Sequence, residues 1–100
     1  MLSVTKDIII NYLKKHKLEF QEKYSIEKIG LFGSFATDKY NDDSDIDIVY
    51  TTNSKGLTYK QSLALEDEFK NTFGKAIDLV NLRYMNPLIK RKAIQDIIYV

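Results

Sequence analysis

The chain alternates between stretches whose apolar residues recur every three to four positions and shorter stretches that are almost continuously apolar. Residues 5–22 follow helical spacing, which predicts an amphipathic helix. Residues 26–32 form a compact apolar run that stops at Gly33, as a buried strand does. We then expect a short helix or turn over 34–39, a loop over 41–44 and a second strand over 45–51.

The second half of the chain carries clear helix boundaries. Thr58 and Gln61 match a capping box, in which each side chain satisfies a backbone N–H of the other residue. Gly74 is well placed to end this helix. The apolar positions of the helix are Leu65, Phe69 and Phe73.

A third strand is predicted over residues 76–82, followed by a last helix. Asn86 is a suitable N-cap and Pro87 suits the first helical position, so this helix should run to about residue 95. Residues 97–100 are predicted to close the chain as an edge strand. The alternation favours an α/β (α+β) fold, with a small mixed sheet of three to four strands covered by about four helices.

Composition limits the functions to consider. The 100 residues fit one domain, 1–100, and 15 basic against 14 acidic side chains leave a net charge of +1. There is therefore no global electrostatic case for binding nucleic acid or an anionic membrane. Cysteine is absent, which excludes disulfides and thiolate zinc sites. No apolar stretch approaches the roughly 18 residues of a membrane span, and the start lacks the order of a signal peptide. We expect a soluble, cytoplasmic protein.

Three aspartates stand out among the predicted strands. In an extended strand, Asp45 and Asp47 share one face, and Ile46 and Ile48 take the other. Asp78 interrupts the apolar third strand. Because two like charges about 4 Å apart repel by about 4 kcal/mol at an effective dielectric of 20, clustered carboxylates need a cation, protonation or open water. Magnesium suits such oxygen ligands and is often held together with substrate phosphates.

A glycine turn supplies the complementary feature. At the mouth of the short helix that follows Gly33, the N–H groups of Ser34 and Phe35 and the Ser34 hydroxyl could hold phosphate oxygens. Taken alone, a Gly-Ser pair is usually an ordinary turn, and the acidic run 42–45 has an equally plain interpretation as a solvated loop. The combination predicts a magnesium-nucleotide site.

The joint motif is Gly33-Ser34, then ten residues, then Asp45-x-Asp47, with Asp78 on a later strand. It resembles the nucleotidyltransferase superfamily related to DNA polymerase beta, and the resemblance covers essentially the whole chain. The short length and the ending look like the minimal nucleotidyltransferase (MNT) branch. That branch is known chiefly as the antitoxin half of toxin–antitoxin pairs whose toxin is a helical HEPN ribonuclease.

The resemblance implies roles for the matching positions only. Gly33 and Ser34 match the residues that hold the β and γ phosphates, and Asp45 and Asp47 match two metal ligands. Asp78 matches a third carboxylate that helps to bind the metal and accepts the proton of the attacking hydroxyl. The implied reaction uses Mg²⁺ or Mn²⁺ and moves a nucleoside monophosphate, AMP from ATP, to a hydroxyl. A tyrosine of a HEPN toxin is the acceptor that this branch suggests, and self-association is left open.

One departure from the family pattern bears on activity. Family members commonly continue Gly-Ser-x-Ala with Arg-Gly, whereas this chain has Thr37-Asp38. If Asp38 points toward the triphosphate, it opposes nucleotide binding, and if it turns outward, little is lost. The basic residues that could replace the arginine are Lys39, Lys90, Arg91 and Lys92.

Two other functions stay in view. The first is a non-catalytic module that neutralises a toxin by contact alone and keeps a degenerate nucleotide site, which the missing Arg-Gly favours. The second is nucleotide transfer to a small molecule such as an aminoglycoside, which is disfavoured because the chain has no second substrate-binding domain.

Overall fold

The computed structural model describes residues 4–53 and 56–100, and the chain alternates helices with strands. The helices are α1 (Lys6–Tyr24), α2 (Gly33–Ala36), α3 (Tyr59–Phe73), the 3-10 turn η1 (Leu82–Tyr84) and α4 (Pro87–Ala93). The strands are β1 (Ile26–Phe32), β2 (Ile46–Thr52), β3 (Ile77–Asn81) and β4 (Ile98–Tyr99).

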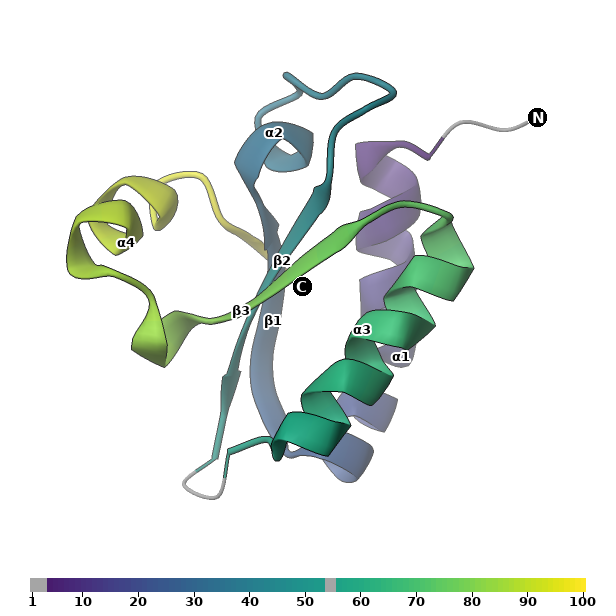
Figure 1. Ribbon diagram of the computed structural model, residues 1–100, viewed down its shortest axis with the longest axis vertical. Coiled ribbons are helices and arrows are strands. Elements are labelled where there is room, and N and C mark those ends of the chain that lie inside the picture. Colours follow the sequence, from purple (N-terminus) through teal and green to yellow (C-terminus); the bar gives the residue numbers. More distant parts are fainter. Residues whose placement is uncertain (1–3, 54–55) are drawn as a thin grey trace.

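The four strands form one mixed sheet in the order β3-β2-β1-β4. β1 runs antiparallel to β2 and β4, whereas β2 and β3 are parallel and are connected through α3. Helices α1 and α3 lie side by side on one side of the sheet, and α4 lies on the other side (Figure 1). The predicted small mixed sheet covered by about four helices is confirmed.

The helix ends follow the capping residues that the sequence indicates. In α3 the capping box is complete, because Gln61 N–H donates to Thr58 Oγ1 and Thr58 N–H donates to Gln61 Oε1, both at 3.0 Å. Gly74 ends this helix, and its N–H donates to Lys70 O at 2.8 Å. Asn86 caps α4 through its Oδ1, which accepts from Leu88 N–H at 2.9 Å.

The main core lies between the sheet and the pair α1 and α3. Alternate residues of β2 face these helices, and Ile46 and Ile48 are completely buried. This confirms the predicted division of the second strand into a packed face and an acidic face. The other fully buried large side chains of the cluster are Ile9, Leu13, Phe20, Ile29, Leu31, Phe35, Leu65 and Phe69.

Several predicted bounds differ from the structure, and three of them have a clear local cause. Asp45 lies one residue before β2, because the strand begins where Ile46 N–H pairs with Ala76 O at 3.0 Å. The third strand stops at Asn81, whose Oδ1 accepts from Arg83 N–H at 3.0 Å and starts the 3-10 turn. Helix α4 ends at Ala93 rather than near residue 95, and a turn follows.

The predicted edge strand at the end of the chain is present and pairs with β1. It approaches β1 closely at Gly30, where an added Cβ would lie 2.7 Å from Ile98 O. Any larger side chain at this position would displace β4. Among the described residues, no helix is long and apolar enough to cross a membrane.

Candidate functional site

The parallel pairing of β2 and β3 places two of the predicted carboxylates side by side. Asp47 is the register partner of Asp78, so both side chains project from the same face of adjacent strands. Adjacent strands lie about 4.8 Å apart. Asp45 precedes β2 by one residue and is exposed. Strand register thus brings together residues that are 31 positions apart in the sequence.

The charge on Asp47 is unfavourable in this position. Its side chain is half-buried, and burial, followed by the negative charges of Asp78 and Asp45, raises its pKa from 3.8 to about 6. The three acids therefore interact electrostatically, although they come from two strands and a loop. A bound cation would relieve the repulsion and favour the ionised form.

These carboxylates form an open arrangement. Within residues 4–53 and 56–100, no three Asp, Glu, His or Cys side chains form a ready-made metal cage. Asp45 and Asp78 are exposed, and the donor set is all oxygen. Magnesium is bound in this manner, since it keeps several waters and takes one or two carboxylates together with substrate phosphates. The residues present fit such an ion, and the three-aspartate ligand set stays a prediction.

The Gly33 turn lies directly against Asp47. Gly33 has a φ of +73°, and a Cβ added there would overlap Asp47 Oδ2 and lie 2.9 Å from Asp47 Cγ. Phe32, the last residue of β1, is the antiparallel partner of Asp47. Only glycine combines this backbone conformation with so close an approach. The predicted phosphate turn and the predicted metal ligand are therefore adjacent.

Helix α2 offers the backbone N–H groups of its first turn and the Ser34 hydroxyl to a ligand. Phe32 is its N-cap residue and makes no side-chain hydrogen bond to the first turn. The Phe35 side chain is completely buried and stacks on Tyr40, with ring centroids 4.2 Å apart. The Phe35 ring thus packs the turn against the core, and the predicted contact of its N–H with a phosphate stays a prediction.

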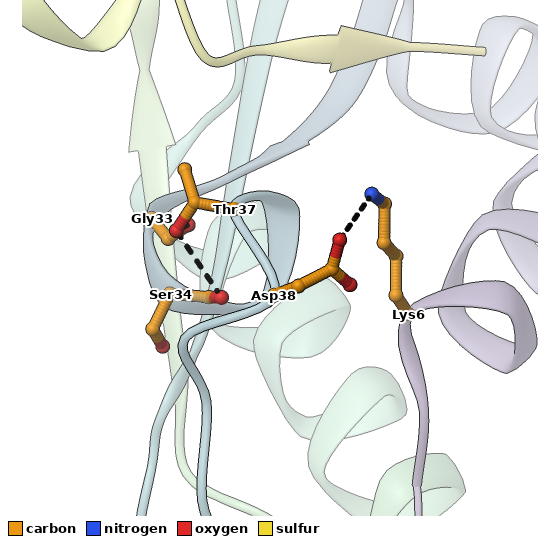
Figure 2. A network of polar contacts seen from close by, with 5 residues as sticks. All are labelled: Lys6, Gly33, Ser34, Thr37 and Asp38. Atoms are coloured by element: carbon orange, nitrogen blue, oxygen red, sulfur yellow. Dashed lines mark hydrogen bonds and ion pairs between the residues drawn. The ribbon is translucent and has the colours of Figure 1, made fainter.

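Thr37, which stands where the family pattern has arginine, stabilises the turn through its side-chain hydroxyl. Its Oγ1 donates to Gly33 O at 3.2 Å (Figure 2). Lys39 N–H donates to Ser34 O at 2.9 Å. Between them Asp38 has a φ of +61°, a left-handed conformation that glycine adopts most easily. The family pattern has glycine at this position, and glycine adopts this conformation at the least cost.

The side chain of Asp38 points away from the turn. Its Oδ2 lies 3.2 Å from Lys6 Nζ, at the start of α1, and Figure 2 shows the carboxylate directed toward Lys6 and not toward Ser34. Of the two orientations considered for Asp38, the structure has the outward one. Lys6 was not recognised from the sequence, because it lies 32 residues away on an ordinary amphipathic helix.

The loop before Asp45 is held by its own polar groups. Asp43 N–H donates to Asn41 Oδ1 at 2.8 Å, and Asn41 N–H donates to Ser44 Oγ at 2.9 Å. Lys75 Nζ donates to Asp42 O at 2.7 Å and ties the loop to the start of β3. The acidic run 42–45 is therefore a hydrogen-bonded turn, and its contacts fix the position of Asp45 next to β2.

A cavity of about 360 Å³ opens beside the Gly33 turn and beneath α4. Its lining residues come from the end of β1 and from one side of α4 and the turn after it: Phe32, Gly33, Leu88, Ile89, Lys92, Ala93 and Asp96. Of the basic residues considered as substitutes for the family's arginine, Lys92 is the one that lines this cavity. The sequence indicated a basic helix but not which side chain faces the turn.

Comparison with known proteins agrees with this geometry. Residues 8–100 match the sequence profile of the family described as Polymerase beta, Nucleotidyltransferase. This chain belongs to that family. A putative protein adenylyltransferase of Methanocaldococcus jannaschii is 38% identical over 103 residues, covering 99% of this chain and 97% of that protein. The resemblance stated from the sequence is confirmed, and the family's activity is nucleotidyl transfer.

Solved structures of this nucleotidyltransferase fold match nearly the whole chain. A toxin–antitoxin crystal structure with AMP-PNP superposes with a TM-score of 0.71 at 21% identity and covers 96% of this chain and 72% of that one. A complex of a tri-AMPylated HEPN toxin from Shewanella oneidensis with its MNT antitoxin superposes with a TM-score of 0.65 at 22% identity, covering 91% and 69%. At these identities the likeness establishes the fold.

Proposed function

We propose that this nucleotidyltransferase transfers AMP from ATP to a hydroxyl of a partner protein, and that it is the antitoxin of a toxin–antitoxin pair. The observation that carries the proposal is the position of Asp47, which lies beside Asp78 in register and directly against Gly33. A nucleotide phosphate at the turn would therefore adjoin the carboxylate pair. This adjacency supports a metal-assisted reaction at a nucleotide phosphate.

The partner and the acceptor come from the relatives. The M. jannaschii relative is named for protein adenylylation, and the S. oneidensis complex holds an AMPylated HEPN toxin. By analogy, the partner of this chain is a helical HEPN-type protein, and the acceptor is one of its tyrosine hydroxyls. The donor is ATP, in keeping with a structural neighbour that contains AMP-PNP.

Asp45, Asp47 and Asp78 would hold Mg²⁺ or Mn²⁺. When bound, such an ion supplies positive charge for the α-phosphate and the departing pyrophosphate. The Ser34 hydroxyl and the N–H groups of Ser34 and Phe35 would hold the β and γ phosphates. An Asp78 carboxylate oxygen would accept the proton of the attacking hydroxyl. That hydroxyl oxygen bonds to the α-phosphorus while the bond to the β-phosphate bridging oxygen breaks, and pyrophosphate leaves.

The direct test is transfer of labelled AMP from α-labelled ATP with Mg²⁺ to a co-expressed HEPN partner. The variant D45N/D47N removes two site charges, and D42N/D43N removes two charges from the neighbouring exposed loop. We expect labelling of the partner by the wild type and the loop variant, and none by the site variant. Equal labelling by the site variant would contradict the proposed catalytic role of these acids.

Metal binding has an independent readout in thermal unfolding. An ion that binds only the folded state stabilises it by about 2.7 kcal/mol at a concentration one hundred times its dissociation constant. We expect Mg²⁺ or Mn²⁺ to raise the melting temperature of the wild type and of D42N/D43N but not of D45N/D47N. A wild type that shows no metal response, with or without nucleotide, would argue against a metal-dependent reaction.

A contact-only antitoxin is the second candidate. The observation in its favour is that Thr37-Asp38 contributes no cation beside the phosphate turn. Under this alternative, D45N/D47N would neutralise the toxin as well as the wild type does. Loss of neutralisation by an intact complex of D45N/D47N with the toxin would exclude it.

A further inference from the structure

The cavity beneath α4 adjoins the Gly33 turn, and its walls are mainly apolar. Phe32, Leu88, Ile89 and Ala93 contribute the walls, whereas Lys92 and Asp96 contribute charges. Residues 88, 92 and 96 are spaced by four, so they follow one side of α4 and the turn after it. The cavity and the carboxylate pair share the Gly33 turn as a common border, because Gly33 also contacts Asp47.

The pair Thr37-Asp38, which replaces the family's Arg-Gly, brings no positive side chain to the phosphate turn. The Thr37 hydroxyl donates a hydrogen bond to Gly33 O, and Lys6 forms an ion pair with Asp38 on the side of the turn that faces α1. A triphosphate carries several negative charges, and the three aspartates add to the negative potential. A cation from another segment of the chain would therefore strengthen nucleotide binding beyond what the metal ion alone supplies.

Lys92 is in a position to provide it. Within residues 4–53 and 56–100, the ion pairs are Lys6–Asp38, His16–Glu19 and Lys70–Glu66, so no carboxylate lies within ion-pair distance of Lys92. Lys90 and Arg91 do not line the cavity. Lys92 and the apolar residues Leu88 and Ile89 beside it are exposed, so its attraction to a phosphate acts at a solvent-accessible surface and should weaken as salt is added.

We propose that Lys92 binds a phosphate of the nucleotide held at the Gly33 turn and replaces, from α4, the arginine that the family pattern has at position 37. The inference rests on the proposed function. Asp96 lies on the same cavity and opposes an anion, so the net attraction is smaller than Lys92 alone would give. Removing the charge of Asp96 should accordingly tighten nucleotide binding.

The test is calorimetric titration with Mg²⁺ and the α,β-methylene analogue of ATP, which cannot undergo transfer. Because K92A removes a charge-assisted contact to phosphate, we expect it to weaken binding about tenfold. The control R91A removes a neighbouring charge outside the cavity and should bind like the wild type. K92R should retain most of the affinity, and D96N should bind more tightly.

Titration with AMP separates a phosphate contact from a general effect on the fold. AMP lacks the β and γ phosphates that the turn is proposed to hold, so K92A should change AMP affinity much less than analogue affinity. Equal losses for both ligands, or analogue binding by K92A that matches the wild type, would overturn the role of Lys92 while leaving the proposed transfer reaction intact. A wild type that binds no nucleotide would overturn both.

Discussion

The two faces of β2 show how one strand serves both the stability of the fold and the chemistry of the site. Ile46 and Ile48 point toward α1 and α3 and are completely buried in the main core. Asp47, between them in sequence, points to the opposite face, beside Asp78 and Gly33. Strand alternation alone separates the two environments, because successive side chains leave the strand on opposite sides.

This difference shows that the face of β2 that carries Asp47, here called the acidic face, lowers the stability of the folded protein. The raised pKa of Asp47 means that folding makes its ionised form less favourable, chiefly through burial. Burial of Ile46 and Ile48 on the packed face has to compensate for this cost in the free energy of folding. Substitutions on the two faces should therefore have opposite effects on folding, and only one face should affect nucleotide binding independently of stability.

The largest effect is expected on the packed face. Ile48→Ala removes a completely buried side chain from the cluster that joins the sheet to α1 and α3. Such truncations cost about 2–5 kcal/mol, through lost apolar burial and the cavity left behind. Urea unfolding measures the loss. The exposed Leu18→Ala is the control, and similar losses for the two variants would contradict the assignment of the core.

Gly33→Ala tests the contact between the turn and the acidic face. The variant combines a left-handed residue, which costs about 1 kcal/mol, with overlap of its Cβ and Asp47 Oδ2. Gly74→Ala has a similar φ of +66° but open space around its Cβ, so it isolates the backbone effect. We expect Gly33→Ala to lose more stability than Gly74→Ala in urea, and to lose nucleotide binding as well. Matching behaviour of the two variants would contradict the close contact.

Asp47→Asn should stabilise the metal-free protein at neutral pH. Because folding raises the pKa of Asp47 to about 6, its contribution to stability is full below pH 4 and is lost as the pH rises through 6. After allowance for solvent screening of this half-buried group, the difference at pH 7 is about 1 kcal/mol. Melting curves in EDTA between pH 4 and pH 8 should show this decline in the wild type and a smaller one in the variant. The same pH profile for both would refute the interpretation.

The smallest effect is expected at Asp38, in the turn that follows α2. Asp38→Gly removes the energetic cost of holding a residue with a Cβ in the left-handed conformation, but it also removes an exposed ion pair with Lys6. An exposed pair contributes at most about 1 kcal/mol and commonly less, so the net gain in stability should be about 0.5 kcal/mol. Asp38→Asn loses the charge but suits the left-handed region, and it should be close to neutral. A clear loss of stability in Asp38→Gly would mean that the ion pair stabilises the fold by more than the left-handed conformation of residue 38 destabilises it.

Local signals in the sequence predicted most of the elements. The Thr58 and Gln61 capping box, Pro87 at the start of α4 and the apolar run that ends at Gly33 all act over a few neighbouring residues, and the structure agrees with each. The end of α4 was predicted two residues too late, since no glycine or proline marks it. Helix ends without such residues depend on tertiary contacts that a sequence pattern does not contain.

The candidate site was predictable in composition but not in geometry. The three aspartates and the Gly-Ser pair can be identified from spacing, whereas the pairing of Asp47 with Asp78 depends on parallel register across a helical crossover. The direction of Asp38 depends on Lys6, which is distant in sequence. The position of Lys92 depends on where α4 lies relative to the end of β1, with which it borders one cavity. Such contacts are set by the whole fold.

The matched register of β2 and β3 makes the alignment of the acids all-or-none. The hydrogen bonds between β2 and β3 join main-chain groups, so substitution of neighbouring side chains leaves Asp47 and Asp78 opposite each other. A residue inserted or deleted inside either strand would instead send one acid to the opposite side of the sheet. Over evolutionary time, this protein should tolerate changes of length between its strands far better than within them.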